Sequence, residues 1–156
     1  MPSTGRLTLL AIAMVIGCRR GPPIPDGDIA ASLTMPAIAG TFDPASLRGK
    51  PSLVMFVTPT CSHCRAVIPR AAAAAYAKDG NVVAVFVTGT ADKAKSVVAF
   101  TQFKGPALVD DGTLRTRYHV DSVPLILVLG PDGHAVDVFE GEQDESTLAS
   151  ALASAR

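Results

Sequence analysis

Two cysteines, Cys61 and Cys64, are separated by two residues and stand between an apolar segment and a long helical pattern. A Cys-x-x-Cys at such a corner places two sulfur atoms within disulfide reach on the first turn of a helix. There, unpaired backbone N–H groups and the helix dipole stabilise a thiolate. Zinc would require four ligands, and the sequence has no second Cys-x-x-Cys and no histidine pair. The pair therefore predicts chemistry that makes or breaks disulfides.

The elements that must position the cysteines can be predicted from the flanking residues. Residues 52–58 form a continuous apolar run of strand length, as in an interior strand of a covered sheet. Pro59 favours extended geometry in the residue before it and so ends this strand. Thr60 is the expected cap of a helix that runs from about Cys61 to Lys78. Pro69 lies inside this helix and is expected to kink it.

The rest of the chain alternates between strand and helix patterns. Two apolar runs joined by Gly-Pro-Asp-Gly predict a hairpin near the end of the chain. A strand–helix–strand unit followed by a hairpin and a helix predicts an α/β sandwich with a mixed sheet. In the last helix, Leu148 and Leu152 lie one turn apart on an expected buried face. The further strands are expected at Asn81–Val87, Leu125–Leu129 and Ala135–Phe139, and the further helices at Asp92–Phe103 and Asp144–Ala155.

These features together resemble the thioredoxin superfamily. The matching features are the apolar strand, the corner Cys-x-x-Cys, the proline in the helix and the later Val123-Pro124. Within the superfamily the chain is most similar to the TlpA/ResA-like group of membrane-tethered thiol-disulfide oxidoreductases. The resemblance covers roughly residues 30 to 155. The stretches typical of that group are Leu47–Pro51, Phe100–Phe103, Leu108–Gly112, Tyr118–Val120 and Gly130–Gly133.

The resemblance implies a thioredoxin-like three-layer sandwich, in which a mixed central sheet is flanked by helices. It also implies a TlpA-type insertion with an extra helix between Thr88 and Tyr118. Pro124 should be cis beside the disulfide, and Val123 should present its backbone to a bound peptide. Cys61, the more exposed cysteine in such proteins, would be the nucleophile, and Cys64 would resolve the mixed disulfide. No cofactor and no resident metal are expected.

The chain departs from this family at positions around the cysteines. Thr60 replaces the usual aromatic residue before the first cysteine and is expected to help tune the redox potential. Met55 stands where thioredoxins carry a buried acid, and Val67 stands where ResA-type reductases carry a glutamate. Both acids handle the proton of the buried cysteine in those proteins. Their loss leaves the fold prediction intact and argues against a strong reductase.

The two residues between the cysteines are expected to tune the redox potential, because they surround the Cys61 sulfur. Ser62 and His63 occupy these positions, and a histidine before the second cysteine resembles the DsbA-type dipeptide. Such a histidine favours the thiolate and makes the protein more oxidising. The potentials of thioredoxin-like and DsbA-like pairs differ by about 150 mV. We expect a potential above that of thioredoxin.

The start of the chain predicts export. Arg6 precedes a ten-residue apolar run, Leu7–Ile16, which is too short to span a bilayer and matches a signal-peptide core. The run leads into Val-Ile-Gly-Cys, which looks like a bacterial lipobox. Lipidation at Cys18 would consume the odd cysteine and attach several acyl chains, enough for stable anchoring. The expected organisation is a signal peptide at 1–17, a tether at 18–29 and one domain at 30–156.

This organisation predicts a lipid-anchored protein of the bacterial cell envelope, with its domain facing the periplasm or the outer surface. The expected partners are client proteins with thiols or disulfides and a membrane redox partner that recycles the pair. The chain carries 14 basic and 14 acidic residues, and the basic ones are scattered. That distribution gives no electrostatic footprint for nucleic acid.

Two other functions fit parts of the sequence. Thr58-Pro-Thr-Cys61 contains the Thr-x-x-Cys element of peroxiredoxin-like peroxidases, although Val54 replaces their usual proline. A copper-delivery module of the same fold could use the two cysteines and a histidine, although such carriers usually space their cysteines wider. His119 and His134 lie in a loop-like stretch and a turn, where solvated positions are expected.

Overall fold

The computed structural model describes residues 22–156, which form a mixed six-stranded sheet covered by helices on both faces. The strand order is β1-β4-β3-β2-β5-β6. β2 pairs parallel with β3 and antiparallel with β5, so the strand that leads to the cysteines lies in the middle of the sheet. The strands are β1 (Ala37–Ala39), β2 (Ser52–Val57), β3 (Asn81–Phe86), β4 (Ala107–Val109), β5 (Leu125–Leu129) and β6 (Ala135–Glu140).

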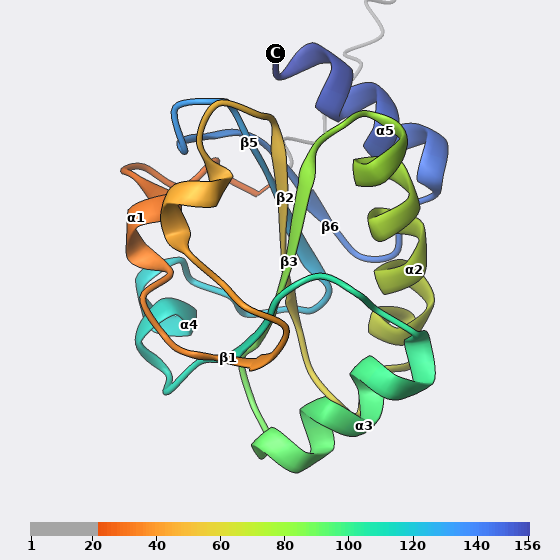
Figure 1. The fold of residues 1–156 in the computed structure, drawn as a ribbon. Helices are drawn as coiled ribbons and strands as arrows, with labels where there is room; N and C mark the ends of the chain where they lie inside the picture. Colours follow the sequence, from red (N-terminus) through yellow and green to blue (C-terminus); the bar gives the residue numbers. More distant parts are fainter. Residues whose placement is uncertain (1–21) are drawn as a thin grey trace, which may run out of the picture.

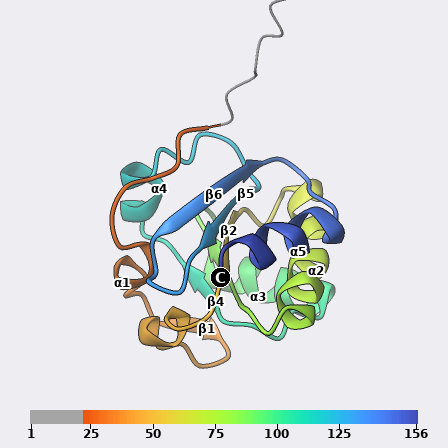
Figure 2. The ribbon, with the colours of Figure 1, turned by 90° about the horizontal axis from the view of Figure 1, so that it is seen from above.

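The helices form the two outer layers. Figure 1 shows α2, α3 and α5 on one side of the sheet and α1 and α4 on the other, and Figure 2 shows the sheet between them from above. This arrangement confirms the thioredoxin-like three-layer fold. The helices are α1 (Ile29–Ser32), α2 (Ser62–Ala77), α3 (Ala91–Thr101), α4 (Thr113–Arg117) and α5 (Glu145–Ser154), and a 3-10 turn, η1, spans Pro44–Leu47.

Every residue of β2 is buried because both faces of the sheet are covered. Successive side chains of a strand point to opposite faces. Met55 therefore joins the apolar cluster beneath α2 and α5, while Phe56 joins the cluster on the side of α1 and α4. Leu148 and Leu152 of α5 are fully buried in the first cluster, as their spacing predicts.

The long elements begin and end within two residues of the predicted positions, whereas the short ones have no counterpart in the predictions. α1, β1, η1, β4 and α4 contain only three to five residues each. The segment between Thr88 and Tyr118 carries α3, the strand β4 and the short helix α4. Asp110, one of two buried polar or charged residues in the part of the chain described, accepts hydrogen bonds from the N–H groups of Leu114 and Arg115 and so secures α4.

The described part of the chain begins on the surface and joins the domain at Asp28. Asp28 pairs with His134 in an isolated antiparallel bridge, and its carboxylate contacts the guanidinium of Arg48. Ile29, at the end of the predicted tether, is fully buried. The predicted signal peptide and Cys18 lie outside the described residues. From Pro22 onward, no helix is long and apolar enough to cross a membrane.

Candidate active site

A tight turn after β2 delivers the first cysteine to the end of the sheet. The N–H of Cys61 donates to the carbonyl of Thr58 at 3.3 Å. Gly89, which follows β3, lies against the ring of Pro59: a Cβ on Gly89 would stand 2.9 Å from Pro59 Cγ. The φ angle of Gly89 is +91°, a conformation that side chains rarely permit. The neighbouring strand thus leaves room for the turn that positions Cys61.

Cys61 itself caps α2. Its backbone is extended, and its Sγ accepts a hydrogen bond from the N–H of Cys64 at 3.0 Å. The prediction that Thr60 caps the helix is therefore wrong by one residue: Thr60 lies on the exposed turn before the cap. A sulfur in the cap position receives both the helix dipole and a direct N–H donor, and both stabilise negative charge on it.

The two sulfur atoms form a disulfide across a sequence separation of 3, with a Cα–Cα distance of 5.2 Å. Their surroundings differ. Cys61 is partly exposed, whereas Cys64 is fully buried in the apolar cluster that also contains Met55 and Val67. Between Pro22 and Arg156, the buried polar or charged residues are Ser52 and Asp110, and Asp110 caps α4. The described structure therefore has no buried carboxylate beside Cys64.

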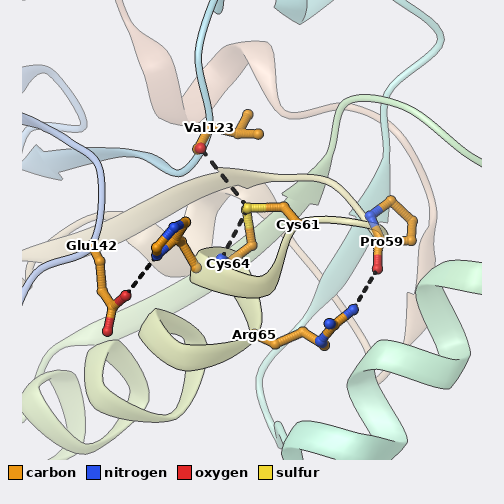
Figure 3. Close-up of a disulfide and its surroundings, with 7 residues drawn as sticks. Pro59, Cys61, Cys64, Arg65, Val123 and Glu142 are labelled. Atoms are coloured by element: carbon orange, nitrogen blue, oxygen red, sulfur yellow. Dashed lines mark hydrogen bonds and ion pairs between the residues drawn. A yellow bond between two sulfur atoms is a disulfide. The ribbon is translucent and has the colours of Figure 1, made fainter.

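The loop before β5 lies against the disulfide. The peptide bond between Val123 and Pro124 is cis, as the family resemblance predicts. The Val123 carbonyl oxygen lies 3.8 Å from Cys61 Sγ, and Figure 3 shows it facing the sulfur. Pro124 is buried, and Val123 is partly exposed. The structure thus brings Val123 and Pro124 together with the cysteines, and Val123 lies 62 residues after Cys61 along the chain.

The two residues between the cysteines both face solvent. Ser62 is exposed, and 71% of the His63 side chain is exposed. His63 Nδ1 lies 2.9 Å from Glu142 Oε2, and the other oxygen of Glu142 accepts from Arg70 at 2.5 Å. The hydrogen bond from His63, and then that from Arg70, hold the pKa of Glu142 below its usual value. Glu142, in the loop between β6 and α5, thus joins His63 to Arg70.

Glu142 is absent from the sequence-based site. Its contact with His63 spans 79 residues, and no local sequence pattern indicates such a pairing.

The other two histidines are exposed at positions 119 and 134, and His134 Nδ1 lies 3.5 Å from Asp132 Oδ2. Among the described residues, no three His, Cys, Asp or Glu side chains come together as a metal site.

Comparison of the sequence with known protein families identifies the family of this chain. A family model described as the thioredoxin-like domain matches residues 40–156. The chain belongs to this family. The soluble secreted antigen MPT53 of Mycobacterium bovis and Mycobacterium tuberculosis is 31% identical over 131 residues, which cover 80% of this chain and 73% of that protein.

Solved structures agree with this thioredoxin-like assignment. A secreted Mycobacterium tuberculosis disulfide oxidoreductase, homologous to E. coli DsbE, superposes with a TM-score of 0.71 at 26% identity, covering 82% of this chain and 99% of that chain. A thiol-disulfide isomerase from Corynebacterium glutamicum gives 0.68 at 19% identity, covering 86% and 96%, and shows the shared fold alone. With its Cys61–Cys64 pair, this family member is a thioredoxin-like disulfide oxidoreductase.

Proposed function

We propose that this thioredoxin-like protein is an extracytoplasmic, membrane-anchored enzyme that exchanges disulfides with client proteins. The observation that carries the proposal is the environment of Cys61. Its sulfur is partly exposed at the helix cap and accepts the N–H of Cys64, whereas the Cys64 sulfur is buried behind it. A client can therefore reach one sulfur, and the helix stabilises that sulfur as a thiolate.

The exchange proceeds through a mixed disulfide. When the protein oxidises a client, a client thiolate attacks Cys61 Sγ, the Cys61–Cys64 bond breaks, and the bonding electron pair leaves on Cys64, which takes up a proton. A second client thiolate then attacks the client sulfur, the client gains its disulfide, and Cys61 leaves as a thiolate. The client loses two electrons, and the pair gains them. The reverse sequence reduces a client disulfide.

Neighbouring residues have secondary roles in this proposal. The backbone of Val123, beside the cis proline, aligns the client chain across the Cys61 sulfur, and the 3.8 Å contact supports this role. Thr60, Ser62 and His63 tune the potential from the exposed side. His63 favours the Cys61 thiolate, and the apolar surroundings of Cys64 give no carboxylate to deprotonate it. The first feature favours a potential above that of thioredoxin, and the second slows the resolving step that a good reductase needs.

Lipid anchoring at Cys18 is the second part of the proposal. Its support is the apolar leader that ends in Val-Ile-Gly-Cys. The secreted relatives support the placement of the domain outside the cytoplasm. In this scheme residues 1–17 are removed, 18–29 form the tether and 30–156 form the domain, while a membrane redox partner recycles the pair. Mass spectrometry of the membrane fraction should find a mature chain that begins at an acylated Cys18. A soluble, unmodified periplasmic species would contradict the anchor.

The catalytic part is tested by two measurements on the soluble chain from Arg19 to Arg156. The first is reduction of insulin by dithiothreitol, which this chain should accelerate. The second is the reduction potential of the Cys61–Cys64 pair in glutathione buffers, which we expect to lie above about −270 mV, the value of thioredoxin. Absence of any acceleration would refute the activity, whereas a potential at or below that of thioredoxin would refute only the oxidising direction.

A further inference from the structure

A groove of about 460 Å³ adjoins the catalytic disulfide on the side of α3. One wall consists of the active-site turn and the start of α2, with Thr60 and Arg65. The other wall is α3, with Lys93, Val97 and Phe100. Because Thr60 directly precedes Cys61, a chain bound in this groove would lie next to the exposed sulfur.

Phe100 gives the groove an apolar rim. It is 76% exposed, more than any other large apolar side chain in residues 22–156. Val97, one turn earlier on α3, is almost fully buried and forms an apolar part of the groove lining. Phe100 and Val97 together give this groove an apolar surface that a large apolar side chain of a bound partner can contact.

The groove also carries positive charge. Arg65 donates to the carbonyl of Pro59 at 3.3 Å, and Lys93 lies on the facing helix. In the described part of the chain, neither side chain forms an ion pair. The nearby carboxylate of Asp92 lies 4.0 Å from Lys95 instead. Two cations without carboxylate partners favour an anionic ligand.

We propose that this groove binds the client segment that flanks its reactive cysteine, and that it selects a large apolar side chain next to a carboxylate. The proposal rests on the exchange reaction described above and adds its specificity. In Figure 3 the Val123 carbonyl and the Arg65 side chain lie on opposite sides of the disulfide. The client chain therefore passes Val123, crosses the Cys61 sulfur and enters the groove, where Phe100 contacts its apolar side chain and Arg65 and Lys93 bind its carboxylate.

The test compares the full chain with four synthetic peptides of equal length, each containing one cysteine. The next positions carry Asp or Lys, combined with Phe or Ser. The rate of exchange is followed by acid quenching and mass spectrometry. The Asp-Phe peptide should react about tenfold faster than the Lys-Ser peptide, which corresponds to one or two modest contacts.

Variants assign this preference to the groove. Lys93→Glu leaves Arg65 as the only cation among the described residues that line the groove and should abolish the preference for Asp over Lys. Phe100→Ser should remove the preference for Phe over Ser. Ratios between peptides are compared, because a general loss of activity would not change them. The matched controls Lys104→Glu and Tyr76→Ser alter an exposed lysine and an exposed aromatic residue away from the groove, and should keep the wild-type ratios.

The outcomes separate this inference from the proposed function. If the wild-type chain exchanges with dithiothreitol but treats all four peptides equally, the groove does not select clients and the inference is wrong. If the chain exchanges with nothing, the proposed function is itself refuted. If Phe100→Ser changes only the sedimentation of the chain, the occupant is a second copy of this chain and the client inference is overturned.

Discussion

The two sulfur atoms of the disulfide belong to different environments, although their residues are only three positions apart. Cys61 lies at a helix cap, is partly exposed, accepts the N–H of Cys64 and faces the carbonyl of Val123 in the loop before β5. Cys64 lies in a purely apolar cluster with Met55 and Val67. Electrostatics therefore favour charge on the first sulfur, and burial opposes charge on the second.

The difference between the two sulfur environments indicates which step of the exchange the structure assists. When a client disulfide is reduced, attack by Cys61 uses a stabilised thiolate, whereas the later attack by Cys64 requires a buried thiol to lose its proton without a nearby base. We infer that the formation of the mixed disulfide is fast and that its resolution by Cys64 is slow. The following predictions test this contrast, from the largest expected effect to the smallest.

Replacement of Cys61 and replacement of Cys64 should have different effects on the exchange reaction. Cys61→Ser should lower the rate of insulin reduction by at least about 10³-fold, because the attacking sulfur is lost. Cys64→Ser keeps the nucleophile and should accumulate covalent adducts with clients, visible by mass spectrometry under non-reducing conditions. Serine changes the volume little in both variants, so each serves as the folding control of the other. Full turnover by Cys61→Ser would overturn the assignment of the nucleophile.

A carboxylate placed beside Cys64 should speed the slow step. Val67 lies one helical turn after Cys64 in the same buried cluster, so Val67→Glu brings a base near the thiol. We expect resolution of a trapped mixed disulfide to become at least about tenfold faster. The unfolding free energy should fall by roughly 1–3 kcal/mol, because a polar group is buried.

Val67→Gln is the matched control for this experiment. It places a side chain of similar size and polarity at the same position, but it cannot accept the thiol proton. It should lose stability as Val67→Glu does, without the gain in rate. Equal resolution rates for the two variants would show that the proton of Cys64 does not limit the exchange.

On the exposed side, His63 should have a smaller effect. His63→Pro removes the imidazole at a position in the first turn of α2, where proline is tolerated. In the reduced protein, the thiolate absorbance of Cys61 should reach its titration midpoint at a higher pH than in wild type, because the imidazole no longer favours the thiolate. The disulfide should also become harder to reduce. Identical titrations of wild type and variant would leave His63 without a role in the chemistry.

The smallest expected effect concerns acid stability at Glu142. Hydrogen bonds from His63 and Arg70 lower the pKa of this carboxyl in the folded state. Its stabilising contribution is therefore present above the unfolded-state pKa of about 4.3 and is lost as the pH falls through the lower folded pKa. Urea unfolding curves between about pH 5 and pH 3 should show a steeper loss of stability for wild type than for Glu142→Gln.

Glu145→Gln controls for the general effect of removing a carboxylate. Glu145 begins α5 close to Glu142 and forms no ion pair within the described residues. Its replacement should leave the acid dependence of wild type in place. A Glu142→Gln profile that coincides with wild type would mean that the contact between Glu142 and His63 does not persist in solution.

Much of the fold could be predicted because its long elements have clear signals. Ser52–Val57 is a continuous apolar run closed by Pro59, and α2 is a sixteen-residue helix that ends close to Asp79-Gly80. β1 and β4 have three residues each, too few to show a period, and they are strands only because each finds a partner in the sheet. Their pairing depends on tertiary contacts, which local patterns do not contain.

The candidate site divides in the same way. Cys61, Cys64 and the Val123–Pro124 pair could be predicted because their residue types and order are specific. Two details of the site, the helix cap and Glu142, could not be predicted from the sequence. A small change in backbone geometry shifts a helix cap by one residue, and the cap of α2 is Cys61, although the sequence predicted Thr60. Glu142 could not be assigned either, because only the folded chain brings its loop to α2.

The short span of the disulfide has a thermodynamic consequence. A bridge over a separation of 3 removes little entropy from the unfolded chain, roughly 2 kcal/mol in the chain-entropy model, against about 3 kcal/mol for a fifteen-residue loop. The sheet and its two apolar clusters must therefore hold the fold in both redox states, and the protein can cycle without unfolding.

The redox potential and the stability of the fold are thermodynamically linked. If the folded protein favours the dithiol over the disulfide, the reduced chain is more stable than the oxidised chain by the same free energy. Since 30 mV corresponds to about 1.4 kcal/mol for two electrons, two denaturation curves report how far the fold moves the potential from that of the unfolded peptide.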